Sequence, residues 1–215
     1  MAINFYYLSG SPFSWRIWLA LEYKELTYQL KVVERERGDL ISERFLKMNP
    51  WGKAPVIEDN GFILYESSAI IEYLEDQYDK SGKSLWPHEI QLRAMARRTL
   101  SEIDTQIYPP VRALVEELVM QQGSSPDMER INGSFEKLRV NLNILVESKQ
   151  GRFLIGDAPG AADFALFPLI EILLRIINNT SHLMPVWSLP PSLRQWQSHV
   201  KKISYVGKTI PPHWR

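Results

Sequence analysis

The hydrophobic pattern changes near residue 84, and this change constrains the fold more than any other feature of the sequence. Up to that point, short apolar stretches of strand length alternate with helical segments, whereas only helical patterns follow it. The small and polar residues of Ser81-Gly82-Lys83-Ser84 have the composition of a linker. We therefore expect an α/β domain over residues 1–80 and an all-helical domain over residues 88–215.

The first eighty residues predict the element order β-α-β-α-β-β-α. A buried strand is expected over Ile3 to Leu8, and Pro12 suits the first turn of the helix that follows. A half-exposed strand is expected over Thr27 to Val33, and the helical connection favours a parallel pair. Asn60-Gly61 lies between two apolar runs, which indicates a hairpin. Further helices are expected at residues 44–48 and from Glu66-Ser67-Ser68 onward.

The second part of the chain predicts four helical stretches, at about residues 88–122, 126–148, 160–178 and 192–203. Pro109-Pro110 falls within the first stretch. Because proline lacks an amide donor and clashes with the preceding turn, we expect this pair to break or bend the helix.

The composition excludes several kinds of chemistry. The 25 Lys and Arg residues balance 25 Asp and Glu residues, so no overall field attracts nucleic acid. The chain has no cysteine, and therefore no thiol nucleophile, disulfide or cysteine-bound metal. Its four histidines, at positions 88, 182, 199 and 213, are scattered singly without metal-ligand spacing, and no phosphate loop or nucleophile elbow is present. We expect no metal.

The N-terminal residues lack the basic and long apolar stretches of a secretory signal. The most apolar segment, residues 161–177, is interrupted by charged residues and is expected to be a buried helix. We therefore expect a cytoplasmic protein with neither a membrane nor a nucleic-acid partner.

Two helix N-termini in the α/β half are candidate anion sites. One follows Ser9-Gly10-Ser11-Pro12 and the other follows Tyr65-Glu66-Ser67-Ser68. Free amides and the helix dipole favour negative charge at such ends, and ligands of α/β sheets tend to bind beyond the strand ends. The alternative is that Ser11 and Ser67 act only as helix caps.

Four motifs, in order and spacing, resemble those of the cytosolic glutathione S-transferases. Residues 11–17, Ser-Pro-Phe-Ser-Trp-Arg-Ile, resemble the serine motif of the tau and zeta classes. Asn49-Pro50 with Lys53-Ala54-Pro55-Val56 resembles the stretch around the family's cis-proline. Glu66-Ser67-Ser68-Ala69-Ile70 resembles its glutathione motif, and Gly156 with residues 159–163 resembles the folding motif of its helical domain.

The resemblance implies a thioredoxin-like N-terminal domain followed by a helical domain, usually in a homodimer. It implies that Ser11 donates a hydrogen bond to the glutathione sulfur, with Ser9 or Ser14 as alternative donors. Ala54 would pair with the cysteinyl backbone, and Pro55 would be cis. Glu66 would bind the γ-glutamyl ammonium, Ser67 the γ-glutamyl carboxylate, and Lys53 the glycyl carboxylate.

The activity implied is conjugation of the glutathione thiolate to small hydrophobic electrophiles in detoxification. The acceptor site would lie between the domains and include Phe13, Tyr108 and Arg112, and Asp104 would reach the glutathione of a partner subunit. A glutathione-dependent isomerase or peroxidase, or a non-catalytic binding protein of the same fold, are the alternatives. Two residues depart from the pattern. Phe13 stands where zeta-class enzymes have cysteine, and Gly160 stands where Ser or Thr usually caps a helix.

Overall fold

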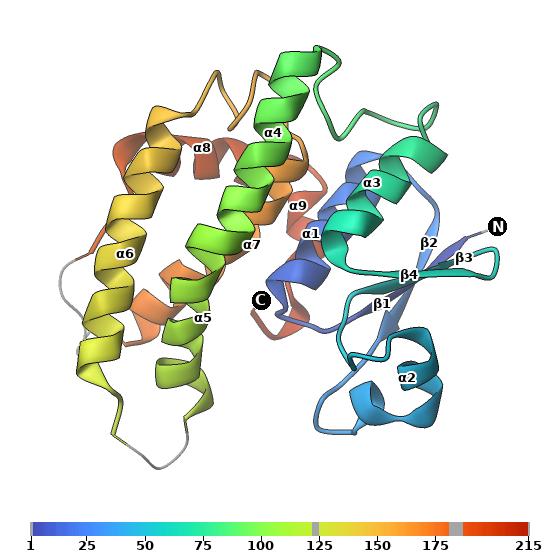
Figure 1. Ribbon diagram of the computed structural model, residues 1–215, viewed down its shortest axis with the longest axis horizontal. Coiled ribbons are helices and arrows are strands. Elements are labelled where there is room, and N and C mark those ends of the chain that lie inside the picture. Colours follow the sequence, from blue (N-terminus) through green and yellow to red (C-terminus); the bar gives the residue numbers. More distant parts are fainter. Residues whose placement is uncertain (1, 122–124, 181–186, 215) are drawn as a thin grey trace. The chain divides into compact units, whose positions relative to one another are not determined.

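The computed structural model describes residues 2–121, 125–180 and 187–214, and His182 lies outside them. Contacts within the chain divide it into two units (Figure 1). The first unit runs to His88 and also includes the residues from Lys201 onward, whereas the second unit is Glu89–Val200.

A four-stranded sheet with the order β2-β1-β3-β4 forms the centre of the first unit. β1 and β2 are parallel, and the other neighbouring pairs are antiparallel. The predicted element order and the predicted hairpin between β3 and β4 are therefore present. The strands are β1 Ile3–Tyr7, β2 Tyr28–Val32, β3 Val56–Asp59 and β4 Phe62–Tyr65.

Helices cover both faces of this sheet. α1 (Pro12–Tyr23) and α3 (Ser67–Gln77) lie side by side on one face, and α2 (Glu43–Met48) lies against the other (Figure 1). A partly buried ion pair connects the end of α1 to α3, in which Lys24 Nζ lies 2.9 Å from Glu75 Oε2. Burial acts to raise the pKa of Glu75, but hydrogen bonds from Ser84, the Leu85 amide and Lys24 outweigh it, so the pKa of Glu75 is lowered.

The last residues of the chain pack on α1. The Trp15 indole N–H donates to Thr209 Oγ1 at 2.7 Å, and the Trp214 ring meets the Trp15 ring edge-on, with centroids 5.4 Å apart. A short helix, α9 (Val206–Thr209), and the 3-10 turn Pro212–Trp214 form this segment. These contacts group residues 201–215 with the first unit, whereas the sequence places them with the helical domain.

The second unit consists of helices. Its α-helices are α4 Ile90–Glu102, α5 Tyr108–Val115, α6 Met128–Glu147, α7 Ala161–Asn179 and α8 Pro191–Lys201, whose last residue belongs to the first unit. The helical stretch predicted over residues 88–122, with a break or bend at Pro109-Pro110, contains π-helical segments at 103–107 and 116–120. The first segment ends just before Pro109-Pro110, and the backbone stays right-handed helical through Ile107 and Tyr108. The two prolines therefore coincide with a π-helical turn and do not end the helix, although each lacks an amide donor.

The side chain of Asp163 connects the start of α7 to neighbouring segments through hydrogen bonds. Its carboxylate is buried and accepts hydrogen bonds from the Leu154 amide at 2.9 Å, the Gly160 amide at 2.9 Å and the Trp196 indole N–H at 2.7 Å. Burial raises the pKa of Asp163 to about 6, and the three donors oppose this shift. Gly160 has no side chain to cap the helix, so only the half of a capping box that Asp163 supplies is present at this position.

Within the described ranges, no helix is both long enough and apolar enough to cross a bilayer.

We expect Asp163→Ala to destabilise the second unit strongly. The substitution leaves three buried donors without their acceptor, at about 1–3 kcal/mol each, so the free energy of unfolding should fall by at least about 3 kcal/mol. Denaturant unfolding measures this change. Asp157→Ala is the control, because Asp157 is exposed and its side chain accepts one amide hydrogen bond, from Arg152. Equal losses for the two variants would contradict the structural role of Asp163.

Candidate functional site

Strand register brings the three predicted binding segments to one edge of the sheet. Val56 lies opposite Tyr6 of β1 and also opposite Tyr65 of β4. The chain that leaves β1, the chain that enters β3 and the chain that leaves β4 therefore lie together. Consistent with this register, Leu8, Ala54 and Tyr65 all pack against the same hydrophobic cluster.

A tight turn connects β1 to α1 and presents Ser11. The Ser11 amide donates to the Leu8 carbonyl at 3.1 Å, and Gly10 has a φ of 81°, as in a type II turn. Ser11 then caps α1, because its Oγ accepts from the Ser14 amide at 3.4 Å. This contact uses an acceptor position of the hydroxyl and leaves its hydrogen available for another acceptor.

The two alternative serines have other partners. Ser14 is buried, and its Oγ accepts from the Leu8 amide at 3.1 Å. Ser9 Oγ lies 3.1 Å from Nδ1 of His213, near the end of the sequence. The burial of Ser14 and the contact of Ser9 with His213 favour Ser11, which is partly exposed, as the hydroxyl that faces a ligand.

Asn49 shapes the loop that precedes β3. Its side chain donates to the Lys53 carbonyl at 2.7 Å and accepts from the Trp51 amide at 3.0 Å. Ala54 and Pro55 follow with a cis peptide bond between them. Lys53 is exposed, so its ammonium is accessible to a ligand in solution.

Glu66 and Ser67 begin α3 at the same edge. Glu66 is exposed and has a φ of 68°, a left-handed conformation that costs a residue with a side chain about 1–3 kcal/mol. Ser67 is buried at the first position of the helix. Such strained residues cluster at functional sites, and the first amides of a helix attract anions.

Arg16 connects the two helix starts, a role that the sequence analysis missed. Its guanidinium is fully buried, stacks 4.9 Å from the centroid of the Phe13 ring and donates from Nη1 to Ser67 Oγ at 3.4 Å. The only available signal was the position of Arg16 within the serine motif. Arg16 therefore carries positive charge under the start of α3.

The remaining candidates lie in the second unit. Tyr108 opens α5 and is half-buried, and Arg112 lies one turn further along. Arg112 Nε donates to Glu116 Oε1 at 2.6 Å, and this bond raises the pKa of Arg112. Asp104 is half-buried within the π-helical segment before α5.

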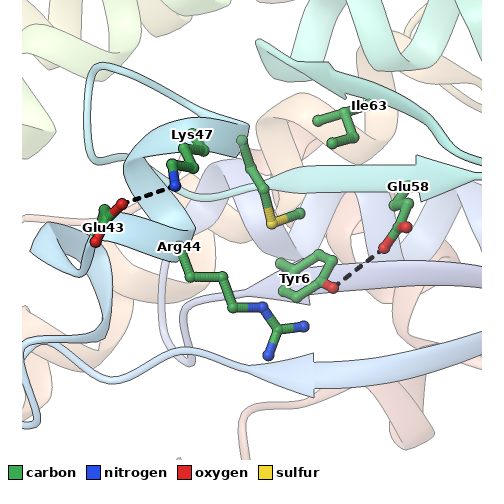
Figure 2. A pocket seen from close by; sticks show the side chains of 7 residues that line it. Tyr6, Glu43, Arg44, Lys47, Glu58 and Ile63 are labelled. Atoms are coloured by element: carbon green, nitrogen blue, oxygen red, sulfur yellow. Dashed lines mark hydrogen bonds and ion pairs between the residues drawn. The ribbon is translucent and has the colours of Figure 1, made fainter.

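A pocket of about 440 Å³ lies between α2 and the sheet, and it contains none of the predicted site residues (Figure 2). Its walls carry charges of both signs, from Glu43, Arg44, Lys47 and Glu58. Tyr6 donates from its hydroxyl to Glu58 Oε2 at 3.2 Å. Burial, followed by the charge of Glu58, raises the pKa of Tyr6. Lys47 Nζ lies 2.7 Å from Glu43 Oε1, so two of the four charged side chains form an ion pair with each other.

Among the residues that the structure describes, no three His, Asp or Glu side chains gather as they would around a metal ion.

Comparison with known proteins identifies the family. Residues 10–77 match the model of the glutathione S-transferase N-terminal domain. The glutathione S-transferase hmp2 of Hypomyces subiculosus is 35% identical over 75% of this chain and 79% of its own length. A maleylacetoacetate isomerase of Dictyostelium discoideum is 31% identical over 73% of this chain and 72% of its own.

The fold agrees with this assignment. The crystal structure of poplar glutathione transferase F1 superimposes with a TM-score of 0.84 at 25% identity, over 97% of this chain and 96% of the poplar chain. The expected fold, a thioredoxin-like domain with a helical domain, is thereby confirmed. The chain belongs to the glutathione S-transferase family of enzymes.

Proposed function

We propose that this enzyme transfers the thiolate of glutathione to small hydrophobic electrophiles and that the Ser11 hydroxyl stabilises the thiolate. The observation that carries the proposal is the geometry of the turn after β1, in which the Ser11 hydroxyl keeps its hydrogen and is partly exposed, whereas Ser14 is buried and Ser9 contacts His213. Ser11 also stands at the N-terminus of α1, where the helix dipole favours a negative sulfur.

The energetics suit this role. A free thiol has a pKa of about 8.5, so little thiolate exists at neutral pH. A hydrogen bond to a charged group contributes about 1.5–3 kcal/mol, which lowers the thiol pKa by about one to two. The bound thiol then ionises near neutral pH and attacks the electrophilic carbon, which forms the C–S bond as the leaving group departs with its electron pair.

The rest of glutathione would occupy the same edge of the sheet. The backbone of Ala54, before the cis bond to Pro55, would pair with the cysteinyl backbone, and Lys53 would bind the glycyl carboxylate. Glu66 would bind the γ-glutamyl ammonium, and Ser67 with the first amides of α3 would bind the γ-glutamyl carboxylate. No metal takes part in this proposal.

For the electrophile, the proposed contacts are Phe13 in the first unit and Tyr108 with Arg112 in the second. A second candidate reaction is glutathione-dependent isomerisation, favoured by the 31% identity to the Dictyostelium maleylacetoacetate isomerase. Phe13 disfavours it, because zeta-class enzymes have cysteine at that position. A panel of aryl halides, enones and maleylacetoacetate separates the two reactions.

A cytoplasmic location is proposed on the strength of family membership.

We expect Ser11→Ala to lower kcat about tenfold to a hundredfold while the KM for glutathione changes only a few-fold, because the lost hydrogen bond acts on the sulfur rather than on the peptide. The pH profile of kcat should shift to higher pH, since the bound thiol then ionises at a higher pKa. Ser14→Ala is the comparison variant. If Ser14→Ala abolishes turnover and Ser11→Ala does not, the assignment of the donor is wrong.

Glutathione affinity should depend on the start of α3. Ser67→Ala and Glu66→Gln each remove a proposed contact with the γ-glutamyl group, and calorimetry should show an affinity loss of about tenfold or more for each. Ser68→Ala, on an exposed neighbour, serves as the matched control. Unchanged affinity in both Ser67→Ala and Glu66→Gln would place the ligand elsewhere.

We propose a homodimer in which Asp104 reaches the glutathione of the partner subunit. The acidic side chains of α3 that could pair across a twofold axis already have contacts inside the chain, because Glu72 accepts from the Trp86 indole N–H at 3.2 Å and Glu75 binds Lys24. The proposal of a homodimer therefore rests on membership of the family. Light scattering at micromolar concentration should give about twice the chain mass of 25.0 kDa. A fully active monomer would contradict it.

A further inference from the structure

A side chain from near the end of the sequence contacts the turn that presents Ser11. His213 Nδ1 lies 3.1 Å from Ser9 Oγ, across 204 residues of sequence. The same imidazole lies against Gly10, where an added Cβ would come within 3.2 Å of both Cε1 and Nε2. His213 therefore contacts both central residues of the turn, Ser9 and Gly10.

Neighbouring contacts hold this imidazole in place. Trp214 packs edge-on against both His213 and Trp15, with ring centroids 5.9 Å and 5.4 Å apart. Its amide donates to the Pro211 carbonyl at 2.9 Å, which closes the 3-10 turn. Thr209 is fully buried and accepts from the Trp15 indole N–H, so the segment is anchored on α1 itself.

The conformation of the turn decides where the Ser11 hydroxyl points. Gly10 has a positive φ, and glycine is the residue with the least resistance to leaving that conformation. A rotation of the peptide between Ser9 and Gly10 would interconvert related turn types and tilt the cap of α1. A hydrogen bond to Ser9 together with a ring packed on Gly10 opposes this rotation.

We infer that His213 is a positioning residue of the thiol site, which acts through Ser9 and Gly10 to hold the turn that aims the Ser11 hydroxyl at the glutathione sulfur. The inference rests on the proposed role of Ser11. It assigns a function to a histidine that the sequence shows only as one of four isolated residues.

The test measures the ultraviolet absorbance of the thiolate of enzyme-bound glutathione across pH, together with kcat and KM, in the full-length protein. His213→Ala should raise the pKa of the bound thiol and lower kcat roughly threefold to tenfold, with the KM for glutathione changed less than about twofold. His213→Asn should restore much of the loss, because its amide can occupy the place of Nδ1. His213→Gln should restore less, because its amide lies nearer the place of Nε2. His88→Ala is the control, an exposed histidine outside the site.

Ser9→Ala supplies an independent variant. If His213 acts through Ser9, Ser9→Ala should resemble His213→Ala, and the double variant should be little worse than either single one. Additive losses, or an unchanged thiol pKa in His213→Ala, would overturn the inference.

Ser11→Ala in the same titration separates the two proposals. If Ser11→Ala raises the thiol pKa while His213→Ala does not, only the role of His213 fails. If Ser11→Ala leaves the thiol pKa unchanged, the proposed function of Ser11 fails first. If Ser9→Ala abolishes the thiolate while Ser11→Ala and His213→Ala do not, both proposals fail and Ser9 is the donor.

Discussion

The pairing of β3 with both β1 and β4 is the constraint on which the site depends. Because Val56 lies opposite Tyr6 and Tyr65, three segments that are far apart in the sequence leave the sheet at one edge. The hairpin at Asn60-Gly61 sets part of this register, since a two-residue turn aligns the strands on either side of it. A slip of one residue would turn Tyr65 to the other face and move the start of α3 away from Ser11.

The N-termini of two helices lie where these segments meet, and together they form the proposed binding surface. α1 and α3 begin close together, and Arg16 joins them through its contacts with Phe13 and Ser67. A fully buried guanidinium is costly unless hydrogen bonds and stacking compensate it, so its presence under two helix N-termini favours anionic groups above them. The site is thus assembled from local turns on the sheet, with long-range contacts from Arg16 and from His213.

Much of this arrangement could be predicted from the sequence because it depends on local signals. The hairpin, the strand-turn-helix at Ser11 and the helix start at Ser67 each follow from turn residues and periodicity. Other features depend on contacts that periodicity does not encode. The direction of the Arg16 side chain, the contact between Ser9 and His213 and the grouping of residues 201–215 with the first unit are of this kind. The exposure of Leu30 and Val32, at 40% and 45%, is also a feature that periodicity does not encode. It depends on the position of β2 at the edge of the sheet.

A crystal structure of the protein with bound glutathione tests the central claim most directly. The account predicts that the sulfur lies within hydrogen-bond distance of Ser11 Oγ, with the γ-glutamyl group at the start of α3 and the cysteinyl backbone beside Ala54. It also predicts that the turn Leu8–Ser11 keeps its conformation, with His213 still in contact with Ser9. A sulfur that lies nearest to Ser9 or to Ser14, or a glutathione molecule bound in the pocket under α2, would contradict the account.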